Sequence, residues 1–485
     1  MIRLTLASSL VLMLAACGAA DETQPPANIA VANQQSAEAG SDTPASSEVA
    51  TAAFSATVRA ADPSLVALYK QLHAAPELSF KEARTSEILA SELEGLGFEV
   101  TRGIGQAWTI EKAKRDVGEV LDGVGGYGVV GVLRNGEGPT VLVRADMDAL
   151  PVAERTGKDY ASKVIDTTWT GVENGVMHAC GHDVHMTTWV GAARELVANK
   201  DNWSGTLIMV AQPAEELGLG GPAMIEDGLF TRFPKPDYNI ALHVSATEPA
   251  GSVVYSSGYA LANVDTVDIK VLGRGGHGAY PHTTIDPVLV SAHIVTALQS
   301  LVARNVNPQN SAVVTVGSLK AGAKHNIIAD EATLLLTVRS YDDETRQTLL
   351  DGIARIAKGQ AEAFGAPEPE IAIEADYIPA TYNDPDLTAR AMTAIGNKIG
   401  AANVREVAPV MGGEDFAHFS RTEEKIPSVI FWLGAVEREK WARAQGGELP
   451  LPSLHSGGFA PDPSPTIATG VDAMSAAVMN LFDAE

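Results

Sequence analysis

The stretch GTLIMVAQPAEE, Gly205–Glu216, is an apolar run that ends in two adjacent carboxylates. A run of this kind is typical of a strand that is buried on both faces of a sheet. The segment before it, VHMTTWVGAARELVAN, has the apolar spacing of a helix, and a second strand-like run, YNIALHV, follows it and ends on a histidine. In α/β folds, polar residues that follow strands gather at the carboxyl edge of the sheet. The stretch therefore predicts an α/β fold with a site at that edge.

A second pattern begins near residue 261. The segments DTVDIKVLG, PVLVSAHIVTALQSLVA, SAVVTVGSL, EATLLLTVRSYD, TRQTLLDGIARIAKGQAEAFG and EIAIEAD follow one another in the order strand, helix, strand, strand, helix, strand. That order is the ferredoxin-like βαββαβ unit. Because a helical pattern resumes at DPDLTARAMTAIGNKIG, we interpret residues 261–375 as a domain inserted into an α/β domain with a central mixed sheet. The α/β domain then comprises residues 61–260 and 376–485.

The composition excludes some classes of partner. The chain has 485 residues and a formal net charge of −25. A chain of this length is expected to form more than one domain. The acidic balance, without a basic patch or a base-stacking motif, argues against nucleic acid and against electrostatic attachment to anionic lipid.

The N-terminus has the features of an export signal. Arg3 precedes an apolar run, Leu4 to Leu14, that is too short to span a membrane, and small residues lead to Cys17. We interpret residues 1–16 as a signal peptide and residues 17–60, which have no Lys or Arg between residues 21 and 57, as a disordered tether. The sequence LAAC resembles the lipobox of bacterial lipoproteins, which implies lipidation at Cys17. Gly18 then favours the outer membrane facing the periplasm, and an ordinary signal peptide is the alternative.

Metal-ligand residue types are concentrated in HACGHDVHM, His178–Met186, which contains the second of the chain's two cysteines. Cys180 and His182 lie two residues apart in a predicted loop. Thiolate, imidazole and carboxylate ligands together suit zinc or another late divalent ion. Further residues of these types fall at or beyond predicted strand ends or late in the chain: Glu215, Glu216, His243 and His455. The side chains of adjacent Glu215 and Glu216 should diverge, so that one binds metal and the other faces substrate.

Several motifs together resemble the metal-dependent aminoacylase/carboxypeptidase family. They are MHACGHDVH, QPAEE, LHV, GRGGHGAYPH, HNIIAD…TVRSYD and GGEDF, and RADMDALP resembles the branch of hippurate, N-acyl-amino-acid and auxin-conjugate hydrolases. The resemblance covers about residues 62 to 482. It implies a dinuclear metal site in a catalytic α/β domain, with the inserted domain serving as a lid and commonly as a dimer interface.

The resemblance implies a role for each candidate residue. Cys180 and His182 would be metal ligands, with the thiolate shared between two divalent ions (Zn, Mn, Co or Ni), and Glu216, His243 and His455 would complete the set. Glu215 would be the general base that takes a proton from a water whose pKa the ions lower. The reverse assignment of the two glutamates is the main rival.

Three lid residues would contact the substrate by the same resemblance. His277 would stabilise the developing oxyanion, reaching across a homodimer into the partner's site. Asn326 and Arg339 would hold a carbonyl or carboxylate, for which the planar guanidinium is suited. The alternative for Arg339 is a structural ion pair within its strand.

Other polar residues near the motifs are expected to support the site. We interpret His178 and His185 as groups behind the ligands, and Asp148 as orienting a ligand histidine. Asp183 is expected to cap the helix that begins there. Asp146 stands where related carboxypeptidases have a metal-binding histidine, and its role stays open. The chain departs from the branch between Thr101 and Gly125, where a longer segment forms either a flap or a surface loop.

We therefore predict a lipid-tethered hydrolase that cleaves the amide bond of an N-acyl amino acid with a water activated on two metal ions. A metallo-dipeptidase or carboxypeptidase is the alternative within enzymes. A substrate-binding lipoprotein without catalysis, or a protein with one structural metal, is the alternative outside them.

Overall fold

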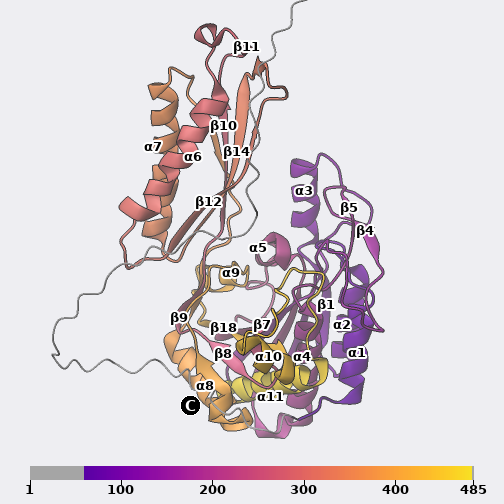
Figure 1. Ribbon diagram of the computed structural model, residues 1–485. Coiled ribbons are helices and arrows are strands. Elements are labelled where there is room, and N and C mark those ends of the chain that lie inside the picture. Colours follow the sequence, from indigo (N-terminus) through magenta and orange to yellow (C-terminus); the bar gives the residue numbers. More distant parts are fainter. Residues whose placement is uncertain (1–58, 483–485) are drawn as a thin grey trace, which may run out of the picture. The chain divides into compact units, whose positions relative to one another are not determined.

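The computed structural model describes residues 59–482 (Figure 1). Its strands form two main sheets, one of eight strands and one of four. Helices cover both faces of the first sheet and one face of the second. The signal peptide and Cys17 lie outside the described residues, as does nearly all of the predicted tether.

The eight-stranded sheet has the order β1-β2-β6-β3-β7-β18-β8-β17. Strands β6, β3, β7 and β18 are parallel neighbours, whereas β1, β2 and β8 pair in the antiparallel sense. The mixed central sheet predicted from the sequence is confirmed. Its strands are β1 (Glu99–Ile104), β2 (Gly128–Asn135), β3 (Thr140–Asp146), β6 (Gly205–Gln212), β7 (Tyr238–Pro249), β8 (Val253–Tyr255), β17 (Val404–Glu406) and β18 (Ser428–Val436).

Successive residues of the central strands enter two different cores. Leu207 and Met209 of β6 belong to the larger core, and Ile208 and Val210 to the smaller one. Both faces of the strand are therefore buried, which accounts for its continuous apolar run.

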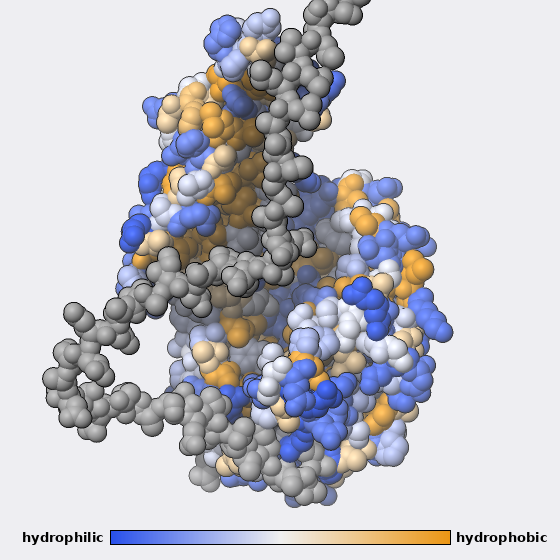
Figure 2. All heavy atoms as spheres, viewed as in Figure 1, coloured by the Kyte–Doolittle hydropathy of each residue, from blue (hydrophilic) through white to orange (hydrophobic). Residues whose placement is uncertain are grey.

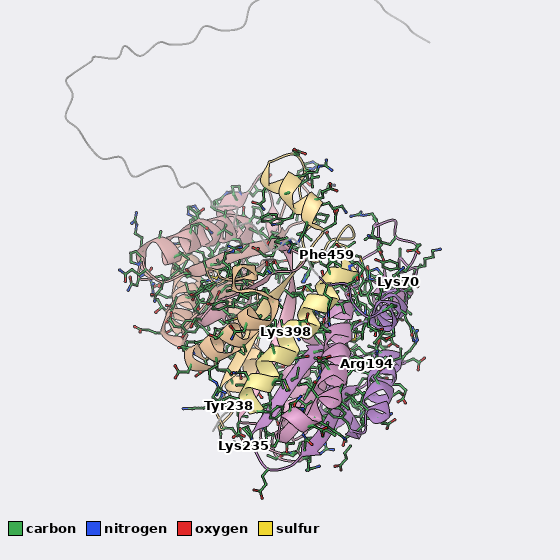
Figure 3. The ribbon with its side chains drawn as sticks, turned by 90° about the horizontal axis from the view of Figure 1, so that it is seen from below. Lys70, Arg194, Lys235, Tyr238, Lys398 and Phe459 are labelled. Carbon is green, nitrogen blue, oxygen red and sulfur yellow. The ribbon has the colours of Figure 1, made fainter. Side chains whose placement is uncertain are left out.

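Each core is covered by its own helices. The larger core is formed with α1 (Pro63–His73), α2 (Ala83–Gly95), α4 (His182–Ala198), α8 (Pro385–Ile399) and α11 (Pro463–Phe482). Figure 3 shows α11 running between α8 and α4 on this face. The short helices α5 (Gly220–Glu226) and α9 (Ala417–Ser420) contribute to the smaller core on the opposite face.

The four-stranded sheet has the order β12-β14-β10-β15, and all of its pairs are antiparallel. Its two helices pack on one face through a separate apolar core. This is the ferredoxin-like arrangement that the sequence predicts. The elements are β10 (Asp265–Leu272), α6 (Pro287–Arg304), β12 (Ala312–Ala321), β14 (Glu331–Ser340), α7 (Asp343–Ala363) and β15 (Glu370–Ile373).

Helix α6 is long and apolar enough, by length and composition alone, to cross a membrane. Its residues Ile294, Leu298 and Leu301 are fully buried in the core of the four-stranded sheet. Packing within this domain therefore accounts for its apolar character.

Two-stranded pairs and short helices complete the described chain. The pair β11–β13 extends from the four-stranded domain, and β9–β16 lies where the chain enters and leaves that domain. The remaining elements are β4 (Ile165–Thr167), β5 (Glu173–Gly175), β9 (Gly258–Leu261), β11 (Gly276–His277), β13 (Ile327–Ile328), β16 (Thr381–Asn383), α3 (Gln106–Asp116), α10 (Arg438–Gln445) and the 3-10 turns η1 (Lys200–Asn202), η2 (Glu215–Leu217), η3 (Pro281–Thr283) and η4 (Ala401–Asn403).

The longer segment between Thr101 and Gly125 forms helix α3. Trp108 of this helix packs near Phe80, with ring centroids 6.5 Å apart. The Nζ atom of buried Lys112 lies 2.6 Å from a carboxylate oxygen of Asp376, on the segment that returns from the four-stranded domain. The segment is therefore a packed helix rather than an open loop.

Candidate metal centre and active site

The candidate site lies beyond the carboxyl ends of β3 and β6. Asp146 ends β3, Glu215 and Glu216 lie in η2 just after β6, and Cys180 and His182 stand at the start of α4. His243 lies within β7 rather than at its end, because β7 continues to Pro249 beside β18 after its pairing with β3 stops at Ala241. The expected strand end at His243 was wrong, but the residue still borders the site.

The sulfur of Cys180 is shared between two groups of candidate ligands. Its Sγ lies 3.3 Å from Nε2 of His243 and 3.2 Å from Nε2 of His455. One group contains Cys180, His182 and His243, and the other contains Cys180, Glu216 and His455, with the ligand atoms of each group within 4.8 Å of one another. A sulfur common to both groups is what a bridging thiolate between two ions requires.

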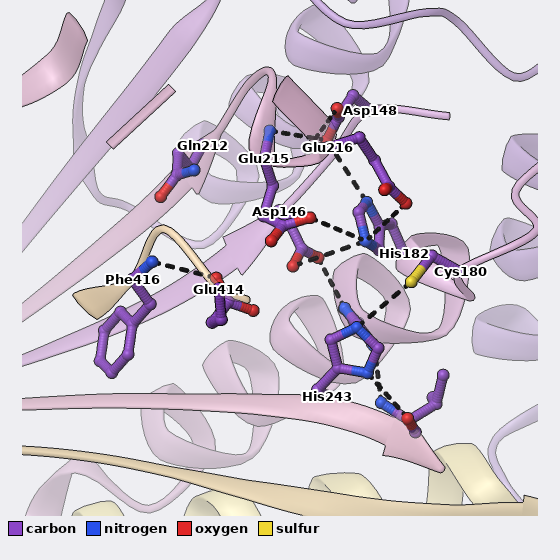
Figure 4. Close-up of polar contacts among 12 residues, drawn as sticks. Asp146, Asp148, Cys180, His182, Gln212, Glu215, Glu216, His243, Glu414 and Phe416 are labelled. Carbon is purple, nitrogen blue, oxygen red and sulfur yellow. Dashed lines mark hydrogen bonds and ion pairs between the residues drawn. The ribbon is translucent and has the colours of Figure 1, made fainter. Parts of the chain in front are cut away.

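Buried atoms without hydrogen-bond partners test whether this set fits a metal. Neither nitrogen of His182 has a hydrogen bond, and Oε1 of Glu216 has none. Oxygens of Glu215 and Glu216 each lie 3.8 Å from Nε2 of His182 (Figure 4). Leaving such atoms buried and unsatisfied costs free energy unless a cation binds them. The residues therefore fit divalent ions.

The pKa shifts lead to the same conclusion. Burial lowers the pKa of His182, but the charges of Asp146, Asp148 and Glu216 outweigh it and raise the pKa to about 10. Burial raises the pKa of the Cys180 thiol, and the charges of Glu216 and Glu215 raise it further. A thiolate and a neutral imidazole, the forms that bind metal, are stable here only with added positive charge.

A glycine allows the two motif ligands to converge. Gly181 has φ of +81°, and a Cβ atom there would lie 2.5 Å from Cγ2 of Val244. Only glycine fits this turn between Cys180 and His182. Gly181 is also the N-cap residue of α4, the position at which we expected Asp183.

The prediction that Asp183 caps α4 was wrong. Asp183 is in the first turn of the helix, and its Oδ2 lies 2.6 Å from Nδ1 of His73. The second ring nitrogen of His73 lies 3.1 Å from Oε1 of Glu154. All three side chains are buried, so the imidazole ring satisfies both carboxylates where water cannot.

Asp148 supports the site as predicted, and it does more than orient His182. Its Oδ1 lies 3.4 Å from Nδ1 of His182. Its two oxygens also accept hydrogen bonds of 3.1 Å from the backbone N–H groups of Glu215 and Glu216. One carboxylate therefore ties the metal-binding motif to the two glutamates.

The two surplus histidines lie outside the shared-sulfur groups. Nδ1 of His185 lies 2.6 Å from Asp146, and its Nε2 accepts a hydrogen bond from the N–H of Val244, so both nitrogens are occupied. His178 is buried, and neither of its nitrogens has a hydrogen bond. Burial lowers the pKa of His178 to about 4.

A buried ionic cluster was missed by the sequence analysis. The guanidinium of Arg144 donates to Asp146, Glu414 and Asp415 at 2.8–2.9 Å. Glu215, Glu414 and Asp415 also form a group whose oxygens lie within 4.8 Å of one another. The alternation in RADMD, which places Arg144 and Asp146 on one face of β3, was the signal for half of this cluster. The other half lies about 270 residues away.

The candidate ligands open into a cavity of about 690 Å³. The side chain of Arg339 lines it, and Nη1 donates to the backbone oxygen of Met411 at 2.9 Å. Within residues 59–482, no carboxylate forms an ion pair with Arg339, and burial lowers its pKa. The apolar wall of the cavity includes Leu261, Val264, Ile378, Val410 and Trp432.

His277 and Asn326 are not brought to the cavity. His277 is in β11 and Asn326 directly precedes β13, and the N–H of Gly278 donates to the backbone oxygen of Asn326 at 2.9 Å. Both residues are exposed, and Nδ1 of His277 accepts only a local hydrogen bond from the N–H of Ala279. Within one chain, these two residues are separate from the candidate metal ligands.

Comparison with known proteins identifies a family and several similar hydrolases. Residues 142–446 match the family model of peptidase family M20/M25/M40. The chain is 39% identical over 353 residues to a hippurate hydrolase of Campylobacter jejuni, covering 72% of this chain and 83% of the relative. It is 36% identical over 386 residues to thermostable carboxypeptidase 1 of Saccharolobus solfataricus, covering 79% and 88%.

A solved structure is similar as well. A Bacillus subtilis protein described as a dinuclear metal binding peptidase from the M20 family superposes with a TM-score of 0.64 at 27% identity. The similarity covers 86% of this chain and 98% of that one.

Proposed function

This chain belongs to peptidase family M20/M25/M40, and from that premise we propose that it hydrolyses the amide bond of N-acyl amino acids. It is a metal-dependent amidohydrolase that uses two divalent ions. The alternative of a binding protein without catalysis is not favoured, because its relatives include a hippurate hydrolase and a carboxypeptidase.

The observation that carries the substrate proposal is the charge pattern of the cavity. Arg339 offers a cation without an acidic partner among the described residues, and it suits the free carboxylate of an amino acid. The carboxylates that line the cavity are Glu215 and Glu216, which belong to the candidate metal centre. The free ammonium of a dipeptide would find no separate acidic partner, whereas an acyl group needs none.

The apolar wall supports the same choice. Leu261 and Trp432 are buried, and the partly buried Val264 lies with Ile378 and Val410 around the same cavity. An apolar acyl group or amino-acid side chain would bury its surface there, at about 25 cal/mol for each Å² removed from water. We therefore propose substrates that combine one carboxylate with at least one apolar group.

Cys180, His182, Glu216, His243 and His455 would hold the two ions, with the Cys180 thiolate common to both. When bound, the ions would polarise the amide carbonyl and lower the pKa of the attacking water.

Glu215 would move the protons of the reaction. Its buried carboxyl has a pKa raised by burial and then by the charges of Glu414 and Glu216, which makes it a stronger base. The carboxylate takes a proton from water as the water oxygen bonds to the amide carbon. It then gives that proton to the leaving nitrogen as the C–N bond breaks, which yields a carboxylic acid and a free amino acid.

A screen of purified, metal-reconstituted protein tests the proposal. Steady-state rates would be measured for N-acyl amino acids, their methyl esters and unblocked dipeptides of matched side chains. We expect kcat/KM to be highest for the N-acyl amino acids with a free carboxylate. Higher values for unblocked dipeptides would instead support a dipeptidase. Equal cleavage of longer blocked peptides would favour a carboxypeptidase, which the same arginine also suits.

We propose that the four-stranded domain is a lid and forms a homodimer. Among residues 59–482, six of the ten exposed large apolar side chains belong to it: Tyr280, Val288, Leu289, Leu319, Ile327 and Ile373. Figure 2 shows apolar surface over this domain. Strand β12 lies at the edge of its sheet, where its outer backbone groups can pair with another strand. Such a dimer would let His277 and Asn326 reach the partner's cavity.

The N-terminal sequence supports a proposal on localisation. Export with lipidation at Cys17 would anchor the enzyme in the bacterial envelope, on the periplasmic side of the outer membrane. Metabolic labelling with a fatty acid tests this proposal. The wild type should carry the label and Cys17→Ser should not. An ordinary signal peptide would leave both the wild type and the variant unlabelled.

A further inference from the structure

The turn that carries Glu215 and Glu216 begins with a residue in an unusual conformation. Ala214 has φ of +49° and ψ of +40°, the left-handed region that alanine rarely adopts. Phe80 is another of the four non-glycine residues in residues 59–482 with positive φ, at 64°. Some interaction must hold both residues in this region.

One carboxylate oxygen contacts both of these residues. Oε1 of Glu82 accepts hydrogen bonds from the N–H of Phe80 at 3.0 Å and from the N–H of Ala214 at 2.9 Å. Glu82 is fully buried. Burial and the charge of Asp148 raise the pKa of Glu82, but Oε1 can accept both hydrogen bonds either as a carboxylate oxygen or as the carbonyl oxygen of the protonated group. Glu82 therefore joins the loop before α2 to the start of the catalytic turn.

Asp148 holds the next two residues of that turn. Its oxygens accept the N–H groups of Glu215 and Glu216, and Oδ2 also accepts from the hydroxyl of Ser79 at 2.6 Å. Three consecutive N–H groups, from Ala214 to Glu216, are thus held by two buried carboxylates. Both carboxylates are tied to the segment between residues 79 and 82.

The position of Glu82 is not explained by stability alone. It directly precedes helix α2 but makes no side-chain capping bond to that helix. Its second oxygen, Oε2, is buried without a hydrogen-bond partner. A buried oxygen without a partner is destabilising, and such features are expected where a residue serves function.

We propose that Glu82 is a positioning residue for the general base: it holds Ala214 in the left-handed conformation that directs Glu215 into the cavity. The inference rests on the proposed role of Glu215 and extends it to a residue outside the cavity. Glu82 lies outside the motifs that carry the family resemblance.

The kinetic test compares three variants with the wild type. Glu82→Ala should lower kcat by about 10²-fold with little change in KM, because a shift of about 1 Å in a catalytic group costs that much. Glu82→Gln keeps an oxygen that can accept both N–H groups, so it should retain most of kcat. The matched control is Glu77→Ala, which removes a carboxylate that binds Arg84 and Thr85 of α2 and has no contact with Ala214. It should lower the thermal midpoint and leave kcat unchanged.

A backbone variant tests the cause of the loss. In Glu82→Ala, the further change Ala214→Gly should restore part of kcat, because glycine adopts positive φ without strain. A crystal structure of metal-free Glu82→Ala should show residue 214 outside the left-handed region and the Glu215 carboxylate displaced. If Glu82→Ala does not fold, Glu82→Asp, whose shorter side chain draws back from Ala214, should show the same loss of kcat.

The proposal is overturned if kcat of Glu82→Ala, per folded and metal-loaded chain, equals that of the wild type, or if Ala214 keeps its conformation in that variant. The kinetic ratios can be measured on any amide that the wild type cleaves. A different substrate preference would therefore refute the substrate proposal without affecting this one. Full turnover by Glu215→Gln would refute the role of the base, while the crystal structure would still test the hold on Ala214.

Discussion

The edge of the central sheet and the β11–β13 pair of the lid both carry predicted site residues, but they differ in how those residues are held. At the sheet edge, His182 and Glu215 are buried, and backbone hydrogen bonds and carboxylates fix their surroundings. On the β11–β13 pair, His277 is exposed and makes only a local hydrogen bond. The first region is complete within one chain apart from its ions. The second region carries exposed side chains, as expected of groups that contact the substrate in a partner subunit.

The largest effect that tests this difference is expected at Glu215. Glu215→Gln keeps the size and hydrogen bonding of the side chain but cannot take a proton, so kcat should fall by roughly 10²–10⁴-fold. Metal content should match the wild type. The neighbouring change Glu216→Gln is the control, because it should lose metal together with activity. Elemental analysis and turnover would be measured on both, and turnover of Glu215→Gln within tenfold of wild type would refute the assignment.

A smaller loss of kcat is expected for a change at His277, and recovery of activity in mixed dimers tests whether His277 acts in the partner's site. His277→Ala should lower kcat by roughly 10²–10³-fold, as loss of one oxyanion donor does. Mixing this variant with Glu215→Gln in equal amounts should restore about one quarter of the wild-type rate, because half of the dimers gain one intact site. No recovery after subunit exchange would show that His277 does not act across two chains.

A moderate effect is expected at Arg339, the contact that belongs to the lid and also lines the cavity. Arg339→Ala should raise KM roughly 10–100-fold for substrates with a free carboxylate, the value of one charged hydrogen-bonded contact. Their methyl esters should be affected much less. Arg304→Ala, which removes an exposed arginine of the same domain, is the control. Equal losses on acids and esters would mean that Arg339 is structural.

The smallest effect concerns the pH dependence of thermal stability, which we assign to His73 at the end of α1 and its contact with Asp183 of α4. Burial lowers the pKa of His73, but the hydrogen bonds that its ring donates to Asp183 and Glu154 outweigh burial and raise the pKa to about 9. A raised histidine pKa stabilises the fold fully below the unfolded value near 6.5, and the gain is lost as the pH rises through about 9. The thermal midpoint of the wild type should therefore fall by a few degrees between these pH values. His73→Gln should reduce that fall, and an unchanged slope would contradict the assignment.

The sequence predicted what depends on local pattern. The buried strand before Glu215 and the βαββαβ order of the lid follow from apolar spacing, and the structure has both. The family resemblance and the two ions are confirmed by the comparisons. The roles of Cys180, His182 and the other ligands came from the resemblance, and their convergence on one sulfur is consistent with it.

What the sequence could not give depends on distant contacts. Glu414 meets Arg144 only because β3 and the loop before α9 lie side by side in the fold. Asp183 was expected at a helix cap, but the chain supplies a buried partner from α1 and a glycine for the turn. Glu82 gave no signal, because its partner Ala214 lies 132 residues later.

The central claim is that the sulfur of Cys180 joins two ions at the edge of the sheet. Anomalous diffraction from crystals of the metal-loaded protein tests it most directly. We expect two peaks per chain on either side of Cys180 Sγ, one near His182 and His243 and the other near Glu216 and His455. A single peak, or two peaks that do not share the sulfur, would contradict it.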